Sequence, residues 1–117
     1  MGALGERLAA AYLEARGYQI RERNVRLPPW GEIDLVVERD GVLALVEVRT
    51  RTGDGYGGAV GSLTRAKRAR MLRAALAYLS RFADDPPAAR IDLVAVTFDR
   101  RGVLLRVEHV DNVVEDE

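Results

Sequence analysis

The chain of 117 residues is 48% hydrophobic and 31% charged, and its formal net charge at pH 7 is zero. This length and composition are typical of one globular domain with a core of its own. The absence of cysteine excludes disulfides and cysteine-based zinc sites. No apolar run could span a bilayer and there is no signal-peptide pattern, so we expect a soluble, cytoplasmic protein. Because the charges balance, any binding to nucleic acid must rest on a local basic patch.

The first half of the chain carries signals for one helix and three strands. Apolar residues at helical spacing predict a helix that Gly17 ends. The dipeptide Asp40-Gly41 is the strongest sequence signal for a two-residue hairpin turn. The expected elements are a helix over 3–16, a strand over 18–26, the rigid loop "LPPWG" (27–31), and strands over 32–39 and 42–49.

The second half is expected to hold one long helix and a second hairpin. Its elements are a glycine-rich loop (53–61), a helix over 63–82 with Ser62 as N-cap, strands over 90–98 and 102–110, and a fraying acidic tail (111–117). The loop contains "GDGYGG", but a hairpin precedes it instead of a dinucleotide-binding βαβ unit, so we interpret it as a flap. The order α-β-β-β-α-β-β predicts a single domain over residues 1–117. Its class is α/β (α+β), with one mixed central sheet flanked by helices.

Two acids, Asp34 and Glu47, lie inside strand-like runs that are otherwise strongly apolar. In the predicted hairpin they are directly opposite each other, with Cβ atoms about 5 Å apart, where like charges are destabilising. Two carboxylates in a partly dry place either share a proton or hold a cation. The same register places Glu32 opposite Arg49, so a salt-bridge network is the alternative. That network leaves the repulsion between the two acids unexplained.

A third acid, Glu6, lies on the first predicted helix. At about 100° per residue it shares a row with Ala9, Ala10 and Leu13 instead of with the charged positions. A carboxylate on an apolar row often points into a site. The alternative is that Glu6 only favours the positive end of the helix dipole.

These residues form a recognisable pattern. An aspartate followed by Glu-x-Lys on a hairpin, with an acid on the preceding helix, resembles the PD-(D/E)XK nuclease superfamily. The chain is more closely similar to the YraN family of small bacterial proteins. The matching stretches are "GERLAAAYLEARGY" (5–18), "RNVR" (23–26), "GEIDLVV" (31–37), "VEVRTR" (46–51) and "AYLSRF" (77–82). The resemblance spans most of the chain and implies a restriction-endonuclease-like fold, similar to that of archaeal Holliday-junction resolvases.

The resemblance also implies a catalytic site. Asp34 and Glu47 become the metal-binding acids and Glu6 the helix-borne acid of the same set. Arg49 occupies the position of the catalytic lysine, although a guanidinium cannot act as a base. The implied cofactor is Mg²⁺ or Mn²⁺, bound by carboxylates together with water and phosphate. The implied function is metal-dependent phosphodiester hydrolysis of DNA, including branched or structured DNA. The alternative is a nucleic-acid-binding module whose catalysis is weak or lost.

A run of basic residues favours a nucleic-acid partner. Residues 49–73 hold seven basic residues and one acid. The expected apolar stripe of the second helix, continued toward its N-terminus, reaches Arg68 and Arg65, so we predict that these two face the site. A solvated helix face is the alternative for the outward residues Lys67, Arg70 and Arg73. The predicted nucleic-acid-binding residues are Arg51, Arg65, Lys67, Arg68 and Arg70. DNA is favoured over RNA, no membrane partner is expected, and a homodimer stays open.

Three further residues carry weaker signals. Trp30, which follows two prolines, either stacks on a base or anchors its loop, and anchoring is the commoner role. Asp92 is expected in a salt bridge at a strand end. His109 lacks the partner pattern of a catalytic histidine.

Overall fold

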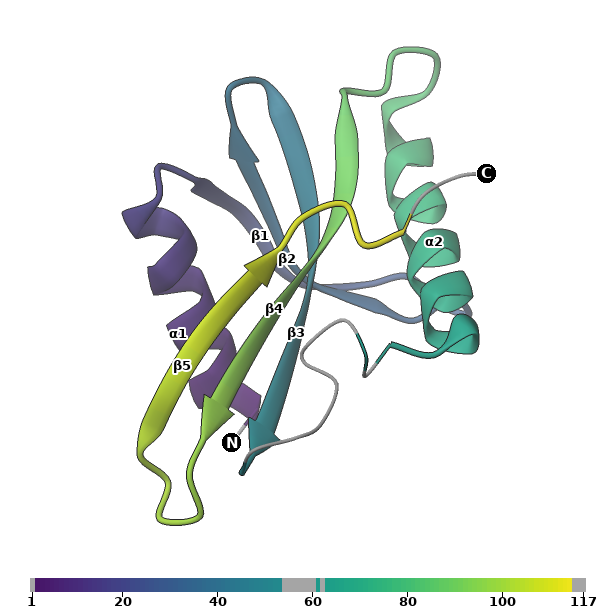
Figure 1. Ribbon diagram of the computed structural model, residues 1–117. Coiled ribbons are helices and arrows are strands. Elements are labelled where there is room, and N and C mark those ends of the chain that lie inside the picture. The colour runs from purple at the N-terminus through teal and green to yellow at the C-terminus, as the bar shows by residue number, and fades with distance from the viewer. Residues whose placement is uncertain (1, 54–60, 62, 115–117) are drawn as a thin grey trace.

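The computed structural model of the chain describes residues 2–53, 61 and 63–114. A five-stranded mixed sheet lies between two helices (Figure 1), and its strand order is β1-β2-β3-β4-β5. The elements are α1 (Gly2–Ala15), β1 (Gln19–Arg26), β2 (Glu32–Arg39), β3 (Val42–Thr52), α2 (Arg65–Leu79), η2 (Ser80–Phe82), β4 (Ala89–Phe98) and β5 (Leu104–Val110). This is the predicted order and the predicted mixed class, and it is compatible with a restriction-endonuclease-like fold. Among the described residues, no helix is both long and apolar enough to cross a membrane.

Three expectations fall on residues outside this description. They concern the flap within 54–60, the N-cap Ser62 and the last residues of the tail, 115–117. Within the described chain, Thr64 is the N-cap of α2, because its side-chain oxygen accepts a hydrogen bond from the N–H of Lys67 at 3.1 Å. Ahead of residues 115–117, Val113 is buried, and its N–H donates to the carbonyl of Ile91 at 2.8 Å.

The hairpin of β2 and β3 has the register expected from its turn. Asp40 and Gly41 have φ angles of 54° and 78°, and a type I′ turn needs positive φ at both positions. After the hairpin, β3 pairs in parallel with β4, and α2 forms the crossover between them. The paired residues of β2 and β3 run from Arg39↔Val42 to Leu35↔Val46.

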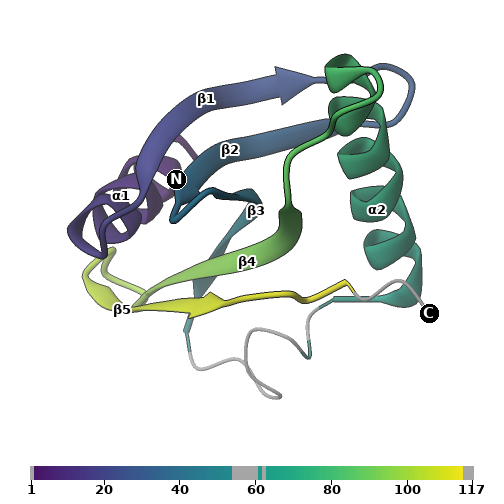
Figure 2. The same ribbon diagram turned by 90° about the horizontal axis from the view of Figure 1, so that it is seen from above.

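The two helices cover opposite faces of the sheet (Figure 2), so the sheet is buried on both sides. This explains why β2 and β3 read as nearly continuous apolar runs. The buried row of α1 contains the predicted residues Ala9, Ala10 and Leu13. The buried residues of α2 are Ala74, Ala75 and Tyr78.

The predicted apolar stripe of α2 is confirmed at Ala75, which is buried, and at Leu72 and Leu79, which pack against the core, but the helix is rolled so that Leu76 lies outside the core. Leu76 is 58% exposed, whereas Ala74 and Tyr78 are buried. Small alanines let the helix approach the sheet, and the Tyr78 hydroxyl donates a hydrogen bond to the carboxylate of Glu22 on β1. Apolar spacing did not reveal this roll of the helix, because it depends on a bond to a distant strand. The roll decides which basic residues face the sheet.

Candidate functional site

The candidate site lies where β2 and β3 separate. Their ladder ends at Leu35↔Val46, and beyond it β2 pairs with β1 while β3 pairs with β4. Asp34 and Glu47 are the next residues, so the predicted direct opposition in the ladder is corrected. Instead, Oδ2 of Asp34 accepts a hydrogen bond from the backbone N–H of Val48 at 2.7 Å. The carboxylate thus replaces a backbone acceptor at the point where the ladder between the two strands ends.

Burial controls the protonation of these two acids. The pKa of Asp34 is raised from 3.8 to about 7, chiefly because burial desolvates the carboxylate, while the hydrogen bond from Val48 acts in the opposite direction. The negative charges of Glu47, Glu6 and Glu32 raise it further. Burial also raises the pKa of Glu47. Neighbouring acids with raised pKa values are typical of functional sites, although structural networks produce them too.

Glu6 approaches the site from α1. It precedes the buried Ala9 by three residues on the same helical row, as predicted. Its neighbour Gly5 packs against the side chain of Thr50 on β3, which brings this end of α1 down onto the sheet. From there the charge of Glu6 acts on Asp34.

Glu32 is a fourth acid of the site, whereas the sequence predicts it only as a partner of Arg49. Its charge acts on both Asp34 and Glu47. It also lines a small hollow together with Glu47 and Met71 of α2. The signal for this was the spacing of two between Glu32 and Asp34, because alternate residues of a strand project to the same side.

Two cations of α2 act on Glu47. The positive charges of Lys67 and Arg70 lower the pKa of Glu47 and so oppose the effect of burial. Both residues share a helical row with the buried Ala74, at spacings of seven and four. They were predicted to face outward; Arg70 is exposed, as predicted, whereas Lys67 is half-buried.

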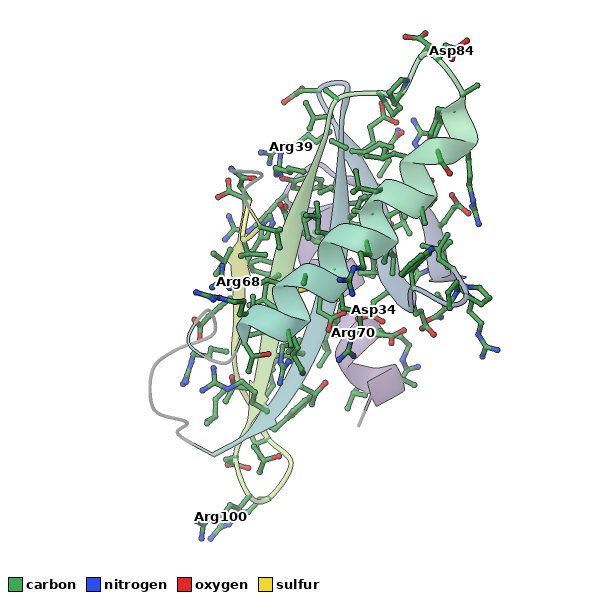
Figure 3. All side chains as sticks on the ribbon, turned by 90° about the vertical axis from the view of Figure 1, so that its right-hand side faces the viewer. Asp34, Arg39, Arg68, Arg70, Asp84 and Arg100 are labelled. Carbon is green, nitrogen blue, oxygen red and sulfur yellow. The ribbon has the colours of Figure 1, made fainter. Side chains whose placement is uncertain are left out.

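The two basic residues predicted to face the site lie elsewhere. In Figure 3, Arg68 and Arg70 leave α2 on opposite sides. Nη1 of Arg68 donates to the carbonyl of Val113 at 2.6 Å, so this guanidinium helps to hold the C-terminal segment. Arg65 is exposed at the start of the helix. The cations of α2 whose charge acts on Glu47 are therefore Lys67 and Arg70.

Arg49 and Arg51 follow Glu47 on β3 at alternate positions, so the three side chains project from one face of the strand. The charge of Arg49 also lowers the pKa of Glu47. The predicted pairing of Arg49 with Glu32 is not part of the β2–β3 ladder. Nη1 of each arginine is buried and has no hydrogen-bond acceptor in the described part of the chain. Such groups are rare in folded proteins, and guanidinium donors of this kind suit phosphate oxygens.

Comparison with known proteins assigns a family. Residues 5–96 match the model of "Uncharacterised protein family UPF0102". The chain belongs to the UPF0102 family. It is 45% identical over 114 residues to a UPF0102 protein of Pelotomaculum thermopropionicum, covering 96% of this chain and 92% of that protein. UPF0102 proteins of Roseiflexus castenholzii and Geobacter metallireducens are 43% and 37% identical, covering 99% and 98% of this chain and 94% and 92% of theirs.

The UPF0102 match confirms the family that the sequence resemblance indicated. The matched region begins just before Glu6 and continues past Arg70, so it contains the acids and the cations of the candidate site. It leaves out β5. The family description names no activity, and the chemistry must be argued from the residues themselves.

The donor set of this UPF0102 site fits a hard divalent cation through two acids. Asp34 and Glu47 offer carboxylate oxygens, and Mg²⁺ is often held by one or two carboxylates together with water and phosphate. Within the described ranges, no three Asp, Glu or His side chains converge closely enough to hold a metal ion. The charge of Glu6 acts on Asp34, and its role as a third metal-binding acid stays a prediction.

A second buried acid of this UPF0102 protein has a different environment. Asp92 on β4 is fully buried. Its carboxylate accepts hydrogen bonds from Nε of Arg90 at 3.0 Å and from the N–H of Asn112 at 3.0 Å, and it lies 2.8 Å from Nε2 of His109. Burial opposes ionisation, but these partners outweigh it and hold the pKa of Asp92 below its ordinary value. Arg90 also donates to the hydroxyl of Tyr18. The expected salt bridge is present, and His109 is one of its partners.

Proposed function

We propose that this UPF0102 protein binds the phosphate backbone of nucleic acid, with DNA favoured over RNA, and hydrolyses its phosphodiester bonds with a divalent cation. The observation that carries the proposal is the meeting of partly buried acids from β2 and β3 with cations from β3 and α2. Phosphodiester hydrolysis requires both signs of charge in one place. Cationic groups hold the phosphate oxygens, and carboxylates hold a metal ion beside them.

Asp34 and Glu47 would hold the cation, Mg²⁺ or Mn²⁺, which when bound polarises the phosphodiester and favours attack by water. A cation between the two carboxylates also offsets the desolvation that raises both pKa values. Glu32 and Glu6 add negative charge around the pair, which increases the attraction for a divalent ion. The acids thus act as one anionic centre built from three elements.

The basic residues would hold the nucleic-acid backbone next to that centre. Arg49 and Arg51 present buried guanidinium nitrogens without acceptors among the described residues. Arg70 and Lys67 face the acids from α2. Guanidinium groups bind phosphate through two parallel hydrogen bonds, which fixes the orientation of the backbone as well as its position. The nucleic-acid strand would therefore lie along the N-terminal half of α2.

Lys67 would take the role that the motif assigns to a lysine at position 49. It is the single lysine among 18 basic residues. Lysine can exchange a proton during a reaction, whereas arginine keeps its charge. Proton transfer by a positioned side chain contributes typically about 10²- to 10⁴-fold to a rate. We therefore assign proton transfer to Lys67 and phosphate binding to Arg49.

Cleavage of labelled duplex, single-stranded and four-way-junction DNA with Mg²⁺ or Mn²⁺ tests the proposal. The wild type should cut at least one of these substrates. Asp34→Asn should not cut, yet in EDTA it should bind DNA as tightly as wild type or slightly more tightly, because it loses a negative charge. Lys67→Ala should lower the cutting rate by about 100-fold or more. Arg100→Ala, which removes a cation from the distant β4–β5 turn, is the matched control and should cut like the wild type.

A binding module without catalysis is the second candidate. Arginine at position 49 favours it, as does the lack of a three-acid group within the described residues. In that case DNA binds with strong salt dependence, but no metal produces cutting. Cutting that appears only in Arg49→Lys would indicate that catalysis depended on the lysine at that position. Unchanged cutting in Lys67→Ala would contradict the role given to Lys67, and absence of DNA binding would contradict both candidates.

A further inference from the structure

The loop between β1 and β2 presents a tryptophan that the fold does not bury. Trp30 is 44% exposed, whereas Leu27 at the start of the loop is 8% exposed and belongs to the core. The N–H of Trp30 donates to the carbonyl of Leu27 at 2.6 Å, and the N–H of Leu27 donates to the carbonyl of Gly31 at 2.8 Å. Leu27 is therefore the anchor of a closed loop. The anchoring role favoured for Trp30 from the sequence is corrected.

Arginines contact this tryptophan and its loop. The guanidinium carbon of Arg73 lies 6.0 Å from the centroid of the Trp30 ring, within the range of a cation–π contact. Gly31, at a φ of 106°, packs against the side chain of Arg70. A surface hollow of about 350 Å³ beside the loop is lined by Arg26, Pro28, Pro29, Gly31 and Glu32.

This environment suits one kind of ligand. A single exposed hydrophobic residue is ordinary and needs no explanation. Trp30 differs because its exposed indole lies on a closed loop, with Arg73 near the ring and Arg70 against Gly31. Single-stranded nucleic acid is recognised by aromatic rings on which bases stack, next to cations that bind the backbone.

The loop leads directly into the candidate site. Trp30 precedes Asp34 by four residues, which span at most about 14 Å. That distance corresponds to at most about four nucleotides, because the duplex rise of about 3.4 Å is shorter than the spacing in an extended single strand. Arg70 packs against Gly31 of the loop and also acts on Glu47 of the site. Figure 2 shows the connection between β1 and β2 beside α2, which carries Arg70.

We propose that Trp30 is a stacking platform for an unpaired base of the strand held at the candidate site. The inference rests on the proposed function and specifies its substrate class. Inside a duplex, both faces of each base are covered by its neighbours, so an indole reaches a base only where the stack is open. The substrate is therefore DNA with an unpaired nucleotide within about four positions of the scissile phosphate. Single strands, frayed ends and junctions meet this condition, and an intact duplex does not.

The chain holds one tryptophan, so its fluorescence reports on Trp30 alone. The full chain is titrated in EDTA with a single-stranded oligonucleotide, a blunt duplex of the same sequence and a single strand with abasic positions. Tryptophan fluorescence follows stacking, and the anisotropy of a dye on the DNA follows binding independently. The single strand should quench the tryptophan, whereas the duplex and the abasic strand should leave it nearly unchanged.

Variants separate stacking from general attraction. Trp30→Ala should weaken binding of the single strand about 5- to 100-fold and leave the affinity for the abasic strand unchanged. Trp30→Phe keeps an aromatic face and should retain most of the affinity. Leu76→Ala, which removes another exposed apolar side chain, is the matched control and should bind like the wild type.

The two readouts distinguish the failure of this inference from failure of the proposed function. Equal affinity of wild type and Trp30→Ala for the single strand, with unquenched fluorescence, overturns the stacking role and leaves DNA binding intact. If Trp30→Ala lost the same affinity for duplex as for single strand, the stacking role would also be overturned, because Trp30 would then contact DNA without stacking on an unpaired base. If anisotropy detects no binding of any DNA, the proposed function falls and the inference falls with it.

Discussion

Asp34 and Asp92 both lie on strands of the central sheet, and their electrostatic situations are opposite. Asp92 is fully buried, accepts a hydrogen bond from Arg90 and contacts His109, and its pKa is lowered. Asp34 is only partly buried, yet its pKa is raised to about 7. The fold gives Asp34 the N–H of Val48 and otherwise surrounds it with other acids.

The comparison shows that partners, more than depth, decide the state of a buried carboxylate. At Asp92 the fold supplies the compensating charges itself, so the ionised acid is part of the structure. At Asp34 the nearby charges that act on the carboxylate are negative, and the cations of α2 and β3 act on Glu47. An acid left in this condition is typical of a place where a ligand supplies the missing charge.

The largest expected difference between Asp34 and Asp92 is in the change of unfolding free energy when each is replaced by asparagine. Asp92→Asn leaves Arg90 and His109 facing a neutral group, and the loss of one member of such a buried cluster costs about 3–5 kcal/mol. Asp34→Asn removes a desolvated charge and keeps an oxygen for the N–H of Val48, so its free energy of unfolding should be equal to or above that of the wild type. Urea unfolding in EDTA near neutral pH measures both. Equal losses of unfolding free energy in the two variants would contradict the difference between the environments of Asp34 and Asp92.

A divalent cation should produce the next largest effect, and only through the acids of the candidate site. At about 100 times its dissociation constant, Mn²⁺ should add about 2.7 kcal/mol to the free energy of unfolding and raise the melting temperature. The double variant Asp34→Asn/Glu47→Gln should lose this rise. Asp84→Asn/Asp85→Asn removes two exposed charges and should keep it. A rise of the same size in both double variants would locate the ion elsewhere.

The smallest effect should appear in the pH dependence of stability. The folded-state pKa of Asp34, about 7, is above its ordinary value of 3.8. Between these values the folded state holds a proton that the unfolded state has released, so stability falls as the pH rises through this window. Asp34→Asn lacks this loss, and its melting temperature relative to wild type should grow by a few degrees from about pH 4.5 to about pH 8 in EDTA.

Asp92 should behave with the opposite sign. Its lowered pKa stabilises the fold above the ordinary value of 3.8, and this contribution is lost only as the pH falls through the lowered value. The wild type should therefore lose stability through Asp92 as the pH falls below about 3.8, and through Asp34 as the pH rises from about 3.8 to about 7. A difference between Asp34→Asn and wild type that stays flat over the neutral range would contradict the raised pKa.

Local signals predicted much of this fold. The Asp40-Gly41 turn determined the register of the hairpin, because a two-residue turn of this type sets the pairing of the strands beside it. Helical spacing placed Glu6 on the buried row of α1. The roll of α2 was not predictable in the same way, since exposed Leu76 is as apolar as a core residue, while Tyr78 is held by a hydrogen bond to a distant strand.

The sequence indicated the two strand acids of the candidate site, but it only partly indicated which cations lie near them. Asp34 and Glu47 stood out because a charge inside an apolar strand is a local anomaly. The approach of Lys67 and Arg70 depends on the roll of α2, and the part played by Glu32 depends on where β2 and β3 separate. Both are tertiary features, because β3 leaves β2 to continue its pairing with β4, a strand that follows only after the helix.

The first turn of α2 has a consequence for the free protein. It carries Arg65, Lys67 and Arg68, and no acid stands among residues 65–68. The positive end of a helix dipole repels cations in that turn, at about 0.3–1 kcal/mol for each, and the Thr64 cap offsets part of this. The helix is thus weakened where its positive potential is highest. If the proposed nucleic acid binds here, its phosphates would offset this repulsion, so the first turn of α2 would be more stable in the complex than in the free protein.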